Sequence, residues 1–224
     1  MGIALAFDVY GTLIDTQNIS IKLATIVGPK ASDFSQLWRN KQLEYSFRRG
    51  LMQRYDSFAV CTAQALDYCC LYYNVLLSET QKRALLDAYA ILPAFDDVKD
   101  SLQSLSDKGV PLYAFSNGPK RAVELLLKQA RIQHYFLDVI SVEDVHSFKP
   151  NPAVYEHLVN KTAASKASVF LVSSNPFDVI GAVSSGLKAA WVKRSPSAVF
   201  DPWGIEPTIT IRSLSELLVN IKHL

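Results

Sequence analysis

Short runs of apolar residues recur along the chain, and small or polar residues end each run. Continuous apolar runs of this length are typical of strands that are buried on both faces of a parallel sheet. Apolar residues at helical spacing separate most of the runs, as in Val98, Leu102 and Leu105. This alternation predicts an α/β fold with a doubly wound parallel sheet. The predicted strands are residues 3–7, 110–115, 139–140, 169–172 and 189–192.

Local start signals indicate further helices. Pro119 suits the first turn of a helix that continues through Val123 and Leu126. Two stretches, 78–81 and 213–216, have the Ser-x-x-Gln/Glu pattern of a capping box, and leucine pairs follow both of them.

One long segment interrupts the alternation of strands and helices. Residues 16–93 show helical patterns and no convincing strand, which indicates a helical insert after the first strand. Ligands of doubly wound sheets bind at the carboxyl ends of the strands, so we expect the insert to lie over these ends as a lid. The predicted domains are a Rossmann-like core of residues 1–15 and 94–224 and a helical cap of residues 16–93.

Residues 65–77 within this insert are apolar on nearly every side of a helix. Such a helix needs cover on more than one face. A partner subunit and burial within the helical insert are both open explanations of this pattern. We expect a homodimer.

Composition limits the partners of the chain. Its 23 Lys and Arg residues nearly balance 21 Asp and Glu residues and are scattered, which argues against nucleic acid or a membrane surface as partner. The first apolar run is too short for a signal peptide, and no run has the length of a membrane span. We therefore expect a cytoplasmic protein. No Gly-rich dinucleotide or phosphate-loop signature is present, so no organic cofactor is expected. The three cysteines, Cys61, Cys69 and Cys70, lack CxxC spacing and are predicted to be buried thiols.

Polar residues follow four of the predicted buried elements. Asp8 ends the first strand, Ser116 and Asn117 end the second, and Lys149 and the stretch 173–178 follow later in the chain. Each has an ordinary structural explanation as a helix cap, a turn residue or a solvated loop cation. Their joint occurrence at one edge of a parallel sheet favours a catalytic site.

These residues carry a family resemblance. Asp8-Val-Tyr-Gly-Thr12, Ser116-Asn117, Lys149-Pro150 and Asp178 resemble, in order and spacing, the four motifs of the haloacid dehalogenase superfamily. The resemblance covers residues 3 to about 192. Most members of that superfamily are phosphatases, with a second aspartate two residues after the nucleophile and paired acids in the last motif. This chain instead has Tyr10 after the nucleophile, and Ser174 and Asn175 in the last motif.

The chemistry of the leaving group gives this difference a meaning. A phosphatase expels an alkoxide that needs a proton, and tyrosine, with a reference pKa of about 10, is a weak donor. A halide leaves without a proton. Magnesium prefers oxygen ligands, commonly carboxylates, and the last motif retains Asp178 alone. No metal site is therefore predicted, and the residues favour displacement at carbon.

The predicted lid strengthens the resemblance. Leu37-Trp-Arg-Asn-Lys-Gln-Leu-Glu-Tyr45 resembles the segment with which L-2-haloacid dehalogenases place an arginine over the site, and Arg39 matches that arginine. A solvated arginine on a helix face is the ordinary alternative. In a dry pocket, a guanidinium stabilises the charge on a departing halide.

The resemblance implies a hydrolysis of short L-2-haloalkanoic acids in two steps. Asp8 attacks C2 with inversion and forms an ester, while Arg39 receives the halide. Water then hydrolyses the ester with Asp178 as the base and releases the 2-hydroxy acid. The remaining implied catalytic residues are Thr12, Ser116, Lys149, Ser173 and Asn175.

The same resemblance implies a set of substrate-binding positions. They are Tyr10, Leu43 and Phe58 in the apolar wall, Asn117 and Phe177 beside the halide, Ser116 for the substrate carboxylate, and Tyr155. Tyr155 is equally well explained as a core aromatic residue of a helix. Pro176 and Phe177 depart from the Ala-Trp of many relatives, which leaves substrate size and halogen preference open.

Two other functions remain possible at this point. A magnesium-dependent phosphatase or phosphonatase of the superfamily would use the same Asp8. A non-catalytic scaffold would use the apolar helix of the insert for association.

Overall fold

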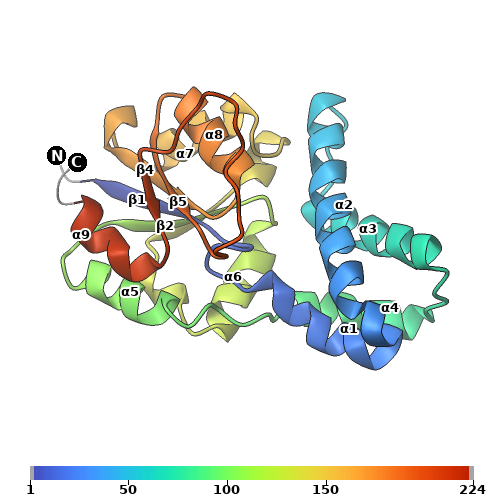
Figure 1. Cartoon of the computed structure of the whole chain (residues 1–224). Helices are drawn as coiled ribbons and strands as arrows, with labels where there is room; N and C mark the ends of the chain where they lie inside the picture. The colour runs from blue at the N-terminus through green and yellow to red at the C-terminus, as the bar shows by residue number, and fades with distance from the viewer. Residues whose placement is uncertain (1–2, 222–224) are drawn as a thin grey trace.

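A six-stranded parallel sheet forms the centre of the computed structural model, which describes residues 3–221 (Figure 1). The strand order is β3-β2-β1-β4-β5-β6, so the chain winds outward in both directions from β1 and the predicted fold class is confirmed. The strands are β1 Ala4–Asp8, β2 Leu112–Ser116, β3 Asp138–Ser141, β4 Val169–Ser173, β5 Lys188–Val192 and β6 Ile209–Ile211.

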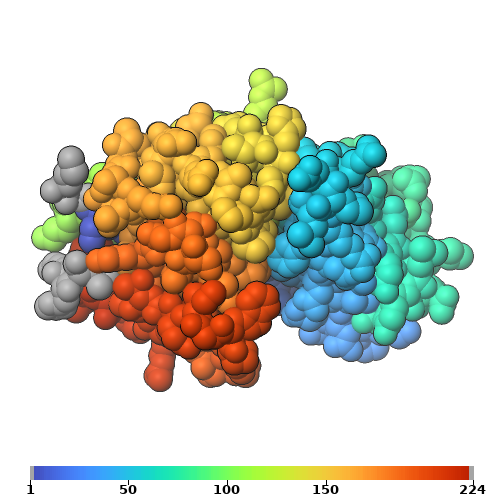
Figure 2. Space-filling view, turned by 90° about the horizontal axis from the view of Figure 1, so that it is seen from above, coloured from blue at the N-terminus to red at the C-terminus, as the bar shows by residue number. Residues whose placement is uncertain are grey.

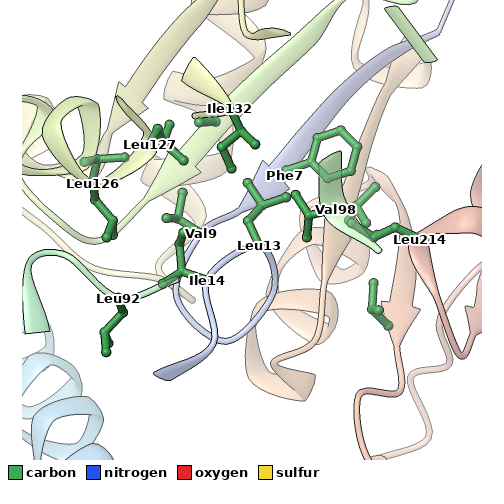
Figure 3. Close-up of a cluster of buried hydrophobic side chains, with 14 of the residues drawn as sticks. Phe7, Val9, Leu13, Ile14, Leu92, Val98, Leu126, Leu127, Ile132 and Leu214 are labelled. Atoms are coloured by element: carbon green, nitrogen blue, oxygen red, sulfur yellow. The ribbon is translucent and has the colours of Figure 1, made fainter. Parts of the chain in front are cut away.

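Helices cover both faces of the sheet (Figure 1). Side chains of α5, α6 and α9 pack in one buried cluster with Leu5 and Phe7 of β1, and part of this cluster is drawn in Figure 3. Side chains of α7 and α8 pack with Ala6 in a second cluster. Alternate residues of β1 therefore enter opposite cores, as the pleat of a strand requires. These helices are α5 Val98–Ser106, α6 Lys120–Gln129, α7 Pro152–Thr162, α8 Pro176–Ser184 and α9 Leu217–Ile221.

Residues 16–93, hereafter the helical segment, contain helices and no strand in the described structure. The helices are α1 Ile19–Val27, α2 Ala31–Leu51, α3 Phe58–Tyr73 and α4 Glu79–Tyr89. Figure 1 shows them together beside the sheet, and Figure 2 shows them as one block against the remainder of the molecule. The division of the chain into a core of residues 1–15 and 94–224 and a cap stays a prediction, and the chain ends 1–2 and 222–224 lie outside the described residues.

The helical segment joins the sheet through two neighbouring stretches of chain. The backbone N–H of Asp15 donates to Pro93 O at 2.9 Å, and that of Phe95 donates to Leu13 O at 3.0 Å. Ile14 and Ala94 form an antiparallel bridge between these bonds. The outgoing and returning chains are therefore hydrogen-bonded to each other.

Three local predictions need correction. The helix predicted over residues 65–77 ends at Tyr73, because Asn74 adopts a left-handed conformation with φ of 52°. The helix after Pro119 begins at Lys120, with Pro119 as its N-cap. Ser213 caps a short 3-10 turn through Ser215 N, and the carboxylate of Glu216 accepts from Arg212 N, so no capping box forms there. The box at Ser78–Gln81 is confirmed.

The prediction for the cysteines is confirmed. The three cysteines are free and buried. No helix within residues 3–221 has the length and apolar character needed to cross a bilayer.

Candidate active site

A tight turn after β1 shapes the surroundings of Asp8. The backbone N–H groups of Leu13 and Ile14 donate to Val9 O at 3.0 and 2.9 Å. Gly11 has a φ of +86°, a conformation that side chains rarely adopt, so glycine permits the chain to reverse here. The reversal returns Thr12 to the end of the strand, where its hydroxyl donates to Asp8 Oδ2 at 2.7 Å.

Asp8 is held through both carboxylate oxygens. Oδ2 also accepts from Asn175 Nδ2 at 2.7 Å, and Oδ1 accepts from Lys149 Nζ at 3.0 Å. The residue is only 6% exposed. The donors come from the turn after β1, the loop before α7 and the start of α8. Together they orient the side chain of Asp8, and the bond from the Lys149 ammonium is charge-assisted and therefore strong.

Lys149 is the central cation of the site and is 1% exposed. Besides Asp8, its ammonium donates to Asp178 Oδ2 and to Phe115 O, both at 2.9 Å. Burial alone would lower the pKa of Lys149, but the charges of Asp178 and Asp8 outweigh burial and raise it. The ammonium therefore stays charged while it contacts two carboxylates.

Asp178 lies behind Lys149 and has no exposed surface. Burial raises the pKa of its carboxyl, and the charge of Lys149 opposes this rise. The hydroxyl of Tyr155 donates to Asp178 Oδ1 at 2.9 Å. Tyr155 is fully buried and supports Asp178, and its place in the substrate-binding set stays a prediction. A side chain at Gly181 would collide with the Tyr155 ring, so this contact depends on glycine in α8.

The other predicted polar residues line the same strand ends. Ser116 Oγ accepts from Gly118 N at 3.0 Å, and Asn117 Oδ1 accepts from Lys149 N at 3.0 Å. Ser173 Oγ accepts from Asn175 N at 3.2 Å. Ser116 and Ser173 have no exposed surface, so both hydroxyls shape the local backbone.

Arg39 extends from α2 toward the sheet. Its Nη2 donates to the carbonyl of Tyr10 at 3.3 Å, and Asn175 Nδ2 donates to the same oxygen at 3.1 Å. Its Nη1 donates to Gln42 Oε1 at 2.7 Å. The guanidinium therefore lies at the nucleophile turn, close to Asn175.

Aromatic side chains enclose this region. The ring of Tyr10 lies 6.0 Å from that of Phe58 and 6.1 Å from that of Tyr89, between centroids. Phe177 meets Phe47 edge to face at 5.0 Å. Burial raises the pKa of the Tyr10 phenol, which stays neutral. Leu43 packs in the same apolar cluster as Phe58.

Two cavities are lined by residues of this region. One of about 240 Å³ is lined by Tyr10, Phe58 and Tyr89. The other, of about 630 Å³, is lined by Phe47, Lys149 and Phe177 together with other apolar residues. A small organic acid fits either volume. Within residues 3–221, no group of three or more His, Cys, Asp or Glu side chains is placed to hold a metal ion.

Sequence reasoning missed several residues that support the site. Ser174 N donates to Thr12 Oγ1 at 2.8 Å, and Arg194 donates to Thr12 O. Asp97 accepts two bonds of 2.8 Å from Arg194. Partners of these residues come from distant segments, so no local pattern indicates them. Gln42, which accepts from Arg39, was also missed. Its place three residues after Arg39 on a helix is the one sequence pattern that indicates such a contact.

Comparisons with known proteins agree with this geometry. A sequence profile described as haloacid dehalogenase-like hydrolase matches residues 5–192. The chain is 35% identical to (S)-2-haloacid dehalogenase 2 of Pseudomonas sp. (strain CBS-3), over 95% of this chain and 93% of that protein. It is 35% identical to haloacetate dehalogenase H-2 of Moraxella sp. (strain B), over 93% and 92%. The structure of L-2-haloacid dehalogenase from Xanthobacter autotrophicus with chloropropionic acid covalently bound superposes with a TM-score of 0.92, at 28% identity and with complete coverage of both chains.

Proposed function

The chain belongs to the haloacid dehalogenase-like hydrolases, and from this premise we propose that it hydrolyses short L-2-haloalkanoic acids to 2-hydroxy acids. The observation that carries the proposal is the pairing of the Asp8 carboxylate with a guanidinium at the same turn. Asp8 is fixed by Thr12, Asn175 and Lys149, and Arg39 reaches the carbonyl of Tyr10 two residues further on. The nucleophile and the guanidinium proposed to accept the leaving group therefore meet at one turn of the chain.

The first step is a displacement at C2 of the substrate. A carboxylate oxygen of Asp8 forms a bond to C2, the carbon–halogen bond breaks, and the halide leaves with the electron pair toward Arg39. Attack from the side opposite the halogen inverts the configuration at C2. The enzyme of Xanthobacter autotrophicus with covalently bound chloropropionic acid supports an ester of this kind.

The second step cleaves the ester at its acyl carbon. Water attacks the carboxyl carbon of Asp8 and gives a proton to Asp178, whose pKa is raised by burial. The Lys149 ammonium, 3.0 Å from Asp8 Oδ1, stabilises the oxyanion. The acyl C–O bond then breaks, the departing oxygen takes up the proton held by Asp178, and the 2-hydroxy acid leaves with an oxygen that came from Asp8.

The remaining site residues are assigned to binding and positioning. Thr12 orients Asp8, and Ser173 orients Asn175, which in turn orients the hydrolytic water. Ser116 and backbone amides of the turns bind the substrate carboxylate. The apolar wall consists of Tyr10, Leu43 and Phe58, and Asn117 and Phe177 lie beside the halide with Arg39.

We also propose that catalysis needs no metal ion. Both carboxylates of the centre, Asp8 and Asp178, already bind the Lys149 ammonium. Tyr10 replaces the acid that a phosphatase would use to protonate an alkoxide, and its buried phenol gives up a proton with difficulty.

The proposal also includes a cap, a cellular location and an oligomeric state. Residues 16–93 act as a cap over the site, since Arg39 enters from α2. The protein acts in the cytoplasm, in keeping with its free buried thiols. It forms a homodimer through α3, where Leu71 is 78% exposed.

Halide release from the two enantiomers of 2-chloropropionate tests the proposed function. We expect chloride from the L enantiomer, D-lactate as product, and the same rate with and without EDTA. Asp8→Asn should release no chloride in the first turnover, and in ¹⁸O-water the label should enter Asp8 before it reaches product. Activity that is lost with EDTA and directed at phosphate esters would overturn the proposal in favour of a phosphatase.

A further inference from the structure

We propose that Gln42 is a positioning residue that holds the Arg39 guanidinium against the departing halide. This inference rests on the proposed dehalogenation. Gln42 is hydrogen-bonded to Arg39, Thr62 and Tyr89, and we assign its effect on the reaction to its bond with Arg39.

Gln42 is a polar side chain without exposed surface, and both the oxygen and the nitrogen of its amide are hydrogen-bonded. Its Oε1 accepts from Arg39 Nη1 at 2.7 Å and from the Tyr89 hydroxyl at 3.2 Å. Its Nε2 donates to Thr62 Oγ1 at 2.5 Å. A buried amide with these partners is expensive to displace, because each lost bond leaves a buried polar atom unpaired.

The donor directions leave one orientation for the amide. Arg39 and Tyr89 both donate, so the atom between them must be the carbonyl oxygen of Gln42. The hydroxyl of Thr62 donates to Phe58 O at 2.8 Å and therefore accepts from the amide nitrogen. Each hydrogen bond in the series from Phe58 to Arg39 therefore joins one donor to one acceptor.

Side chains from three helices meet at Gln42. Arg39 and Gln42 belong to α2, Thr62 to α3 and Tyr89 to α4. Trp38 Nε1 adds a bond to Thr62 O at 2.8 Å. The helical segment therefore fixes Arg39 from within, before any substrate binds.

The partners of Arg39 do not use all of its donors. Arg39 donates to Gln42 Oε1 and to Tyr10 O, the Tyr89 hydroxyl is a further hydrogen-bond partner, and a guanidinium has five N–H donors. We assign the remaining donors to the halide. A guanidinium that is already oriented needs little reorganisation when charge develops on the leaving group.

Single-turnover halide release separates this role from a general effect on folding. For Gln42→Met we expect chloride release from L-2-chloropropionate to slow by about tenfold to a hundredfold. Bromide release from L-2-bromopropionate should slow less, because bromide leaves with less electrophilic help. Hydrolysis of the Asp8 ester, measured as product formation after halide release, should keep its rate.

A double-mutant cycle tests whether Gln42 acts through Arg39. In an Arg39→Met background, Gln42→Met should have no further effect on halide release. Gln36→Met, the same change at an exposed position of α2, is the matched control and should behave as wild type. If Gln42→Met does not fold, Tyr89→Phe, which removes one donor to Gln42, carries the test with a smaller shift in the same direction.

Two results would overturn the inference. If Gln42→Met slowed the release of chloride and of bromide equally, Gln42 would serve folding alone. The same would follow if Gln42→Met slowed halide release as much in the Arg39→Met background as in wild type. A wild-type protein that releases no halide from either substrate would instead refute the proposed function, so the two failures are distinguishable.

Discussion

Lys149 Nζ lies 2.9 Å from Asp178 Oδ2, and both side chains are buried. The same ammonium lies 3.0 Å from Asp8 Oδ1. One cation therefore links the proposed nucleophile of the first step to the proposed base of the second. Neither carboxylate can lose this contact without leaving a charge uncompensated in the interior.

Replacement of Lys149 by methionine is expected to damage both activity and stability. Two buried carboxylates would then face each other without a cation, and the pKa of Asp178 would rise further. We expect a loss of about 3 kcal/mol in unfolding free energy at pH 8 and at least about a hundredfold in turnover. A carboxyl whose pKa is raised in the folded state stabilises the fold at low pH and loses this effect as the pH rises. The stability deficit of Lys149→Met relative to wild type should therefore be smaller at pH 5 than at pH 8. Urea unfolding at pH 5 and pH 8 measures the deficit for Lys149→Met and for the exposed control Lys161→Met. An equal deficit of Lys149→Met at the two pH values would contradict the prediction.

Tyr155→Phe should slow ester hydrolysis and leave halide release intact. The change removes the 2.9 Å bond to Asp178, a bond that favours the ionised carboxylate. The pKa of Asp178 should therefore rise, and the acid limb of ester hydrolysis should move to higher pH. We expect a loss of about tenfold near neutral pH. Rapid-quench measurement of the two steps checks this against Tyr113→Phe, and slower halide release with normal hydrolysis would refute it.

The carboxylate of Asp97 should stabilise the folded protein at neutral pH and lose this effect in acid. Burial opposes ionisation of this carboxyl, but bonds from Arg194 and from Leu214 N outweigh burial and lower its pKa. A carboxyl whose pKa is lowered in the folded state stabilises the fold at pH values above its pKa in the unfolded chain, about 3.9. This stability is lost as the pH falls through its pKa in the folded protein. Asp97→Asn should therefore cost about 2 kcal/mol at pH 7 and progressively less below about pH 4. Denaturant titrations across this range, with the exposed neighbour Asp96→Asn as control, measure the difference, and a deficit independent of pH would exclude the proposed ionic origin.

The proposed homodimer predicts a different response at two exposed leucines. Leu71 of α3 is 78% exposed and Leu125 of α6 is 60% exposed. Wild type and Leu125→Asp should have the mass of a dimer by light scattering, whereas Leu71→Asp should have the mass of a monomer because a buried unpaired charge opposes association. A monomeric wild type at micromolar concentration would reject the dimer.

The sequence predicted the inner strands well because burial on both faces makes each of them a continuous apolar run. It missed β6, Ile209–Ile211, which is short and carries an exposed Thr210 between its apolar residues. The end of α3 was also missed, because it depends on a left-handed Asn74 inside an apolar stretch. Such features are set by the turn and the edge of the sheet, where a hydrophobic pattern carries little information.

The site was predictable to the extent that parallel strands end at one edge. Asp8 and Ser173 belong to adjacent strands, so their proximity follows from topology. The contacts of Gln42 with Tyr89, and of Arg194 with Thr12, join segments far apart in sequence and follow only from packing. The sequence places Tyr155 on a helix, but the bonds of its hydroxyl to Asp178 depend on packing between α7 and α8 and follow from no local pattern.

The paired backbone bonds at Asp15–Pro93 and Leu13–Phe95 bear on how this fold diversifies. They close the nucleophile turn with main-chain atoms, so the turn's shape owes little to the particular helices between residues 16 and 93. Related chains that differ in those helices would keep these main-chain bonds and the position of Asp8. Arg39 belongs to the same helices, so such differences would alter the stabilisation of the leaving group and not the nucleophile.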